Sequence, residues 1–138
     1  MFLIDTNVIS EIRKKQKINK GVKQFLKSVI DEKNTLHISV ITIGELRRGI
    51  ELIRHRGDIK QANLLEKWLI LILTEYQDNI LEIDEDIAQF WGKLRSPHPE
   101  NALDKLIAST AIIHDLTVVT RNDKYFIQTG VKVLNPFI

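Results

Sequence analysis

The sequence predicts an α/β protein, a three-layer α/β/α sandwich around a central parallel sheet of about five strands. Short apolar segments rich in Ile, Leu and Val alternate along the chain with longer segments in which apolar residues recur every three or four positions. Parallel strands need a helix-length crossover between them, and such crossovers place helices on both faces of the sheet. No repeat, linker or low-complexity tract interrupts residues 1–138, so we expect a single domain.

The first half of the chain contains two of the predicted strands and four of the helices. Both strands, at residues 3–5 and 37–41, are short and apolar. The helices are predicted at residues 7–15, 22–30, 42–54 and 59–75. The helices at 22–30 and 42–54 have apolar residues on one face, and the last helix is apolar nearly all round at its end. A short polar turn over residues 55–58 separates the last two helices.

The second half repeats the alternation of strands and helices. Strands are predicted at residues 80–83, 116–120 and 131–134. Asp84 can cap a helix that runs to about residue 95, and a further helix covers residues 101–114. Residues 96–99, Ser-Pro-His-Pro, form the loop between these two helices.

The composition limits the kinds of site and location that we expect. Cysteine is absent, which excludes disulfides and thiolate metal sites and fits a reducing cytoplasm. The N-terminus lacks the pattern of a signal peptide, so we expect a cytoplasmic protein. The longest apolar run, Trp68 to Leu73, is too short to span a bilayer, and it packs either in the core or against a second chain. The net charge of +2 and pI near 8.9 weakly indicate a polyanionic partner.

Several acidic residues stand near predicted helix starts, and each has an ordinary structural interpretation. Asp5 follows the first strand and can cap the next helix. Glu45 ends the sequence Thr-Ile-Gly-Glu, the pattern of a capping box that starts at Thr42. Asp104 lies in the first turn of the helix that begins near Asn101, where a negative charge favours the helix dipole.

The fold nevertheless brings these acids to one place. Strand ends and helix starts share one edge of a parallel sheet, which is where ligand crevices of such sheets lie. Asp5, Glu45 and Asp104 therefore meet there, together with Asn122 and Asp123, which are otherwise an ordinary turn sequence after the strand at 116–120. Like charges about 4 Å apart repel by roughly 1–4 kcal/mol, so such a cluster either takes up protons or holds a cation.

The donor atoms in this cluster indicate which cation and which chemistry to expect. Oxygen ligands favour Mg²⁺ or Mn²⁺, and the four histidines show no spacing that suits zinc. A divalent cation at an acidic crevice of a mildly basic protein suggests phosphodiester hydrolysis by a metal-activated water. Two alternatives stay open: an aspartyl-phosphate phosphotransferase or phosphatase with Asp5 as nucleophile, and a non-catalytic module that binds nucleic acid or protein, in which the acids only cap helices.

Five motifs, in this order and spacing, resemble PIN-domain proteins, specifically toxins of the VapC/FitB type from bacterial toxin–antitoxin pairs. They are Leu3-Ile4-Asp5-Thr6-Asn7, Thr42-Ile43-Gly44-Glu45-Leu46 with Gly49, Asp104-Lys105-Leu106-Ile107-Ala108 with Ala111, Val119-Thr120-Arg121-Asn122, and Asn135-Pro136-Phe137. The resemblance covers nearly the whole chain and implies a PIN-like fold and a Mg²⁺- or Mn²⁺-dependent endoribonuclease.

The resemblance also assigns roles to individual residues. It implies that Asp5, Glu45 and Asp104 are catalytic acids and metal ligands. The fourth acidic position of the family falls on Asn122, with Asp123 beside it, so either residue can complete the site. The resemblance also gives supporting roles to three polar residues, Thr6, Asn7 and Thr120.

The partners that the resemblance implies are an RNA substrate and a cognate antitoxin whose tail covers the crevice. It further implies a homodimer, a higher toxin–antitoxin assembly, contact with DNA only through the antitoxin, and no membrane. Among the basic residues, Arg13, Lys14 and Arg121 are nearest in sequence to the expected crevice, so we expect them to contact RNA phosphates.

Overall fold

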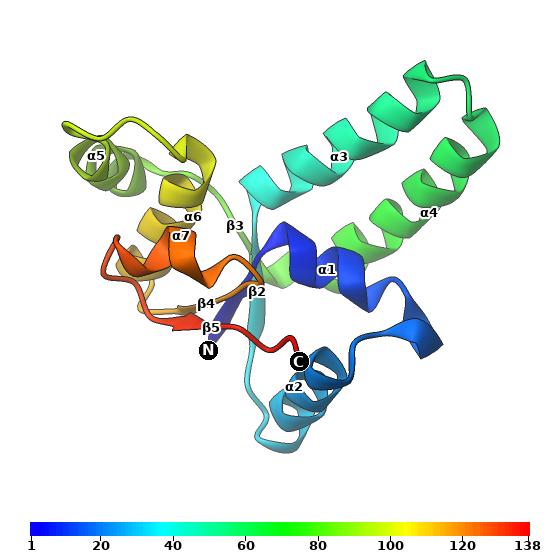
Figure 1. The fold of residues 1–138 in the computed structure, drawn as a ribbon, viewed down its shortest axis with the longest axis horizontal. Helices are drawn as coiled ribbons and strands as arrows, with labels where there is room; N and C mark the ends of the chain where they lie inside the picture. The colour runs from blue at the N-terminus through cyan, green and yellow to red at the C-terminus, as the bar shows by residue number, and fades with distance from the viewer.

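A central sheet of five parallel strands organises the protein, described by a computed structural model that covers residues 1–138 (Figure 1). The strands are β1 (Phe2–Ile4), β2 (Leu36–Ser39), β3 (Ile80–Leu81), β4 (Thr117–Val119) and β5 (Val133–Leu134). Their order across the sheet is β3-β2-β1-β4-β5, and all neighbouring pairs are parallel. The chain reverses its direction across the sheet between β1 and β4, so the topological switch point lies at their carboxyl ends.

Seven α-helices connect the strands and cover both faces of the sheet. They are α1 (Thr6–Ile12), α2 (Lys20–Asp31), α3 (Val40–His55), α4 (Ile59–Glu75), α5 (Glu85–Leu94), α6 (Ala102–Ile113) and α7 (Asp123–Ile127). Two single turns of 3-10 helix occur at Lys15–Lys17 and Gln77–Asn79. The long helices α3 and α4 form a hairpin that extends outward from the sheet (Figure 1).

Alternating strand residues point to opposite faces, and they build two cores. Ile4, Ile38 and Val119 pack beneath α1, α2, α3 and α4 in the larger core. Leu3 and Val118, their neighbours in β1 and β4, pack on the other face against α6 and α7. The predicted three-layer α/β/α sandwich with a parallel five-stranded sheet is thus confirmed.

Side-chain caps fix where several helices begin. Asp5 accepts a hydrogen bond from the backbone N–H of Thr6 at the start of α1, and Asp84 accepts one from Ile87 at the start of α5, as predicted. Ser39 caps α3 through the N–H of Ile41. Because α3 starts at Val40, two residues before the predicted start, the capping box proposed for Thr42 and Glu45 is wrong.

Several other boundaries differ from the prediction. The predicted strands at 37–41, 80–83 and 131–134 are shorter in the structure because their last or first residues belong to helix starts and loops. Asn101 precedes α6 but adopts a left-handed backbone conformation (φ 56°) and makes no capping hydrogen bond with its side chain. The short helix α7 was predicted as loop, because five residues are too few for a helical period to be recognised in the sequence.

The apolar segment from Trp68 to Leu73 divides between the core and the surface. Leu69 and Ile72 are buried in the larger core, as one of the two predicted alternatives requires. Ile70 and Leu71 are 53% and 65% exposed, so this side of α4 presents apolar surface to solvent. No helix is both long enough and apolar enough to cross a bilayer.

Candidate active site

Asp5 lies at the switch point, at the carboxyl end of β1, and is held there by four hydrogen bonds. Its backbone N–H donates to the Val119 carbonyl (2.9 Å), which continues the pairing of β1 with β4. Its Oδ1 accepts from the N–H of Thr6 (2.8 Å). Its Oδ2 accepts from the Thr120 hydroxyl (2.8 Å) and from the Asn7 amide (3.3 Å). The carboxylate is therefore oriented on both oxygens by residues that the sequence placed in supporting roles.

Glu45 reaches Asp5 through Thr6. It projects from the second turn of α3, and its Oε1 accepts a hydrogen bond from the Thr6 hydroxyl (2.9 Å). Thr6 thus contacts both acids, one through its backbone N–H and the other through its hydroxyl.

Asp104 approaches the same spot from the first turn of α6. The start of α6 is fixed by Trp91 of α5, whose indole N–H donates to the Ala102 carbonyl (2.8 Å). Trp91 is therefore tied to the helix start that carries Asp104, and it is only partly exposed.

The pKa values of all three acids are raised. Burial raises the pKa of Asp104 to about 6, and the charges of Asp5 and Glu45 add to this rise. The pKa of Glu45 is also raised, first by burial and then by the charge of Asp5, against a lowering hydrogen bond from Thr6. Burial raises the pKa of Asp5 as well, although the hydrogen bonds from Thr120, Thr6 and Asn7 oppose it.

The donor set suits a hard divalent cation. It consists of carboxylate oxygens backed by hydroxyl and amide donors, with no sulfur or imidazole among them. The acids do not form a closed chelating cage, since no set of three or more Asp, Glu and His side chains is close enough to hold an ion without side-chain movement. Burial raises the pKa of all three acids, and the charges of Asp5 and Glu45 raise that of Asp104 further, so a bound cation would favour the charged carboxylates.

The two residues predicted for the fourth position do not join this network with their side chains. Asn122 is exposed, and it contributes only its backbone N–H, which donates to the Thr120 hydroxyl (3.0 Å). The Asp123 carboxylate accepts from the N–H of Lys124 at the start of α7 (3.1 Å). Neither side chain forms a hydrogen bond with Asp5, Glu45 or Asp104.

The three predicted phosphate-binding residues have different surroundings. Lys14 pairs with the buried Glu11 (2.9 Å) and so is already neutralised. Arg13 is exposed, and its guanidinium lies 5.8 Å from the centre of the Trp68 ring. Arg121 directly adjoins the acidic site, because its backbone N–H donates to the Asn7 side-chain oxygen (3.0 Å).

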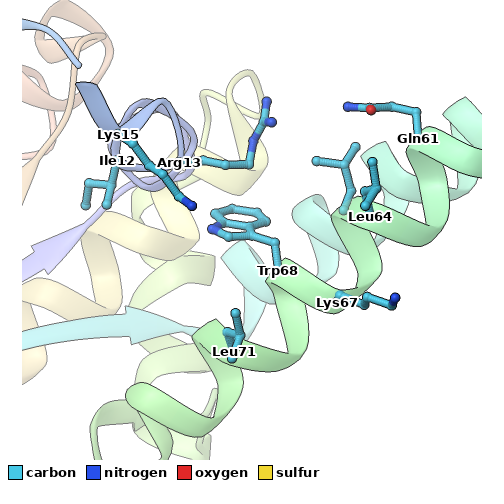
Figure 2. A pocket seen from close by; sticks show the side chains of 9 residues that line it. Ile12, Arg13, Lys15, Gln61, Leu64, Lys67, Trp68 and Leu71 are labelled. Carbon is cyan, nitrogen blue, oxygen red and sulfur yellow. The ribbon is translucent and has the colours of Figure 1, made fainter. Parts of the chain in front are cut away.

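A groove between α1 and α4 leads toward the acids and was not predicted as part of the site. It has a volume of about 420 Å³, and Figure 2 shows Arg13 and Lys15 facing the Trp68 and Leu64 side of α4 across it. A second hollow of about 280 Å³ shares Arg13, Leu65 and Trp68 with the groove and extends to Thr6 and Glu45. The signal in the sequence was the apolar segment of α4, from which Trp68 and Leu71 line this groove.

Comparisons with known proteins identify the family and agree with the fold. The family model described as PIN domain matches residues 2–132. The chain is 38% identical over 143 residues to Toxin FitB of Neisseria gonorrhoeae, with 99% of each chain covered. The crystal structure of FitAcB from that organism superposes with a TM-score of 0.83 at 38% identity, covering 99% of this chain and 98% of that chain.

Two more distant relatives carry informative descriptions. VapC ribonuclease Y4jK of Sinorhizobium fredii is 29% identical over 144 residues, covering 99% of this chain and 98% of the relative. A toxin–antitoxin complex from Klebsiella pneumoniae has a TM-score of 0.69 at 27% identity and covers 99% of this chain and 98% of that chain.

Proposed function

The chain belongs to the PIN-domain family, and from this premise we propose that it is a divalent-metal-dependent endoribonuclease and the toxin of a toxin–antitoxin pair of the VapC/FitB type. The observation that carries the proposal is the meeting of Asp5, Glu45 and Asp104, from three separate elements, at the switch point of the sheet. The relatives named toxin and ribonuclease support the same activity.

In the proposed mechanism, Asp5, Glu45 and Asp104 hold Mg²⁺ or Mn²⁺. When bound, such a cation lowers the pKa of a water molecule and offsets the charge of the phosphodiester. The protein contributes orientation: Thr120 and Asn7 fix Asp5, and Thr6 fixes Asp5 and Glu45 relative to each other. We propose that Asn122 or Asp123 completes the site through a rotation of its side chain, because both closely follow Thr120, the residue directly after β4.

The direct test is cleavage of RNA by the protein purified without any partner. We expect cleavage with Mg²⁺ or Mn²⁺ and none with EDTA. Total RNA is the first substrate, followed by purified structured RNAs such as tRNA. If no RNA is cut with either metal, or if cleavage is the same in EDTA, the proposed activity is wrong.

A phosphotransferase that uses Asp5 as nucleophile has less support. Both oxygens of Asp5 accept hydrogen bonds, and the Asn7 side chain, which would be the second acid of such a site, instead donates to Asp5. No phospho-aspartate should therefore be trapped.

The stability of the metal-free protein should depend on the charge of Asp104. The folded-state pKa is about 6, above the usual value of 3.8, so the folded state binds the proton more tightly than the unfolded state. Stability should then fall as the pH rises from about 4 to about 6, by roughly 1 kcal/mol once solvent screening at this half-exposed group is allowed for. Urea unfolding in EDTA should show this fall in the wild type and a smaller one in Asp104→Asn, where only Glu45 and Asp5 still have raised pKa values.

Added Mn²⁺ should offset the loss of stability that the charged Asp104 carboxylate causes. At pH 7.5 the cation should raise the melting temperature of the wild type, because it binds only the folded state, and raise that of Asp104→Asn much less. Equal shifts for both proteins would mean that the ion binds somewhere else.

The proposed partner of this protein is its cognate antitoxin. We propose that an apolar segment of the antitoxin occupies the groove between α1 and α4, which is continuous with the hollow that reaches Thr6 and Glu45 (Figure 2). A homodimer and a larger toxin–antitoxin assembly, in which the antitoxin makes the DNA contacts, belong to the same proposal, and light scattering of the purified complex measures its size.

Substitution of one groove residue should separate inhibition from activity. Leu71 lines the groove and is 65% exposed, so Leu71→Asp should leave the fold and the RNA cleavage intact. It should raise the antitoxin concentration needed for half-inhibition by about tenfold or more, the cost of losing a buried leucine. Ile70→Asp, at the neighbouring exposed position outside the groove, is the control. Unchanged inhibition of Leu71→Asp would place the antitoxin elsewhere.

A further inference from the structure

We propose that the C-terminal segment, residues 135–138, positions Arg121 to contact a phosphate of the RNA next to the acidic site. Phe137 is the positioning residue, and Arg121 is the residue that touches the substrate. The inference deepens the proposed ribonuclease function and rests on it.

The C-terminal segment is held firmly against the start of α2. The Asn19 side chain accepts from the N–H of Ile138 (3.2 Å) and donates to the Ile138 carbonyl (3.2 Å). Pro136 is buried, and its carbonyl lies so close to Gly21 that any Cβ at this position would clash with it and with Ile138. Figure 1 shows this end of the chain beside α2. The segment is thus a fixed part of the structure rather than a loose end.

The same segment contacts Arg121 through a hydrogen bond and an aromatic ring. The Asn135 amide donates to the Arg121 carbonyl (3.3 Å), and the Asn135 side-chain oxygen accepts from the N–H of Phe137 (3.0 Å). This turn places the Phe137 ring under the Arg121 guanidinium, whose carbon lies 4.1 Å from the ring centre. A stacked guanidinium is held by its face, which leaves the N–H groups at its edge free to bind the oxygens of a phosphate.

Arg121 is held from the other side by the acidic site itself. Its backbone N–H donates to Asn7, whose amide group donates to Asp5 and to Thr120. Its guanidinium also lies 4.0 Å from Glu11, which is buried and already accepts from Lys14 and Asn19. A chain of direct contacts therefore connects the C-terminal segment, Arg121 and the candidate metal ligand Asp5.

The exposure of Arg121 suits a substrate contact. Its side chain is 56% exposed although its backbone is fixed by hydrogen bonds at both the N–H and the carbonyl. Of the three basic residues expected to bind RNA, Lys14 pairs with Glu11 at 2.9 Å, whereas Arg121 lies 4.0 Å from the same carboxylate. Arg13 and Arg121 each lie over an aromatic ring, Trp68 and Phe137 respectively. Arg121 is the one whose backbone is bonded to the network around Asp5, so it is the cation best placed to meet a phosphate next to the bond that is cut.

Steady-state cleavage of a labelled RNA tests the proposal. We expect Arg121→Ala to raise KM about tenfold and to change kcat less than twofold, because a phosphate contact contributes to binding more than to chemistry. Phe137→Leu should raise KM about threefold, as expected when a cation–π contact is lost. Phe137→Tyr keeps the ring and should restore the wild-type KM. The double variant should behave like Arg121→Ala alone, since Phe137 acts through Arg121.

The salt dependence of binding separates positioning from a merely structural role. In the Asp104→Asn background, which we expect to bind RNA without cutting it, Arg121→Ala should make the slope of log affinity against log salt shallower by about 0.7, the value for one phosphate contact on a single strand. Phe137→Leu should shift the slope in the same direction. Arg56→Ala, at the exposed far end of α3, is the control that should leave KM and slope unchanged.

Each contrary result has a distinct meaning. If Phe137→Leu lowers kcat and the melting temperature together, leaves the slope unchanged, or adds its full effect to that of Arg121→Ala, the segment is only structural and the inference is wrong. If Arg121→Ala cleaves RNA with the wild-type KM, the inference fails while the ribonuclease function stands. If the wild-type protein neither binds nor cleaves RNA, both fail.

Discussion

Asp104→Asn is expected to abolish RNA cleavage, lowering kcat/KM by at least about 1,000-fold, while the protein stays folded. The substitution preserves shape and removes one negative charge from a site that we propose holds a divalent cation. Metal-ion catalysis supplies several kcal/mol of transition-state stabilisation, and each 1.36 kcal/mol corresponds to a factor of ten in rate. Cleavage of a defined RNA under single-turnover conditions with saturating Mn²⁺ measures the loss.

A matched control separates the catalytic interpretation from the helix-dipole interpretation of Asp104. Asp86 is also in the first turn of a helix, α5, and is exposed. If Asp104 only favours the dipole, Asp86→Asn and Asp104→Asn should both have small effects. We expect Asp86→Asn to cleave RNA like the wild type. A similar activity in Asp104→Asn would contradict the proposed site.

Thr120→Val is expected to have the second-largest effect, on activity and stability together. The Thr120 hydroxyl donates to Asp5 and accepts from the Asn7 amide and the Asn122 backbone N–H, and the residue is fully buried. Valine has the same shape but makes none of these bonds, so buried polar groups lose their partner. We expect the free energy of unfolding to fall by about 1–3 kcal/mol and cleavage to fall by about 10- to 100-fold because Asp5 is no longer held in place.

Thr117→Val in the same strand is the control for this prediction, because it makes the same chemical change at the far end of β4. Urea unfolding and cleavage rates should both stay close to those of the wild type. If Thr120→Val also behaves like the wild type, then Asp5 does not depend on Thr120 for its orientation.

The layers of the fold could be predicted because each depends on a local pattern. Leu3 and Ile4 are adjacent apolar residues that pack on opposite faces of the sheet, which is what a strand buried on both sides requires. The helix α4 has apolar positions in excess of what one buried face needs, and the structure shows Leu69 in the core and Leu71 exposed beside the groove.

The errors arose where a local pattern competed with the tertiary structure. The capping-box pattern at Thr42 and Glu45 suits a helix start, but the observed cap is Ser39, three residues before Thr42. Glu45 is thereby released from a capping role and is bound by Thr6 instead. Because Glu45 does not cap α3, its proposed role as a metal ligand gains support.

The sheet topology alone was enough to predict that the acids lie together, but not the side-chain contacts around them. Any parallel sheet brings strand ends and helix starts to one edge, which was enough to group Asp5, Glu45 and Asp104. The hydrogen bond from Arg121 to Asn7 spans 114 residues, and the ring of Phe137 meets Arg121 only after the chain has folded. Such pairings depend on register and side-chain direction, which a single sequence does not reveal.

The central claim is that the three acids form one cation-binding catalytic centre, and the affinity of the protein for Mn²⁺ tests it most directly. Calorimetric titration of the metal-free protein should show binding in the wild type and in Asp86→Asn, and at least a tenfold weaker affinity in each of Asp5→Asn, Glu45→Gln and Asp104→Asn, as expected when a charged ligand is lost (about 1.4 kcal/mol or more). If all three variants bind Mn²⁺ as tightly as the wild type, the acids serve as helix caps and surface charges, and the proposed centre does not exist.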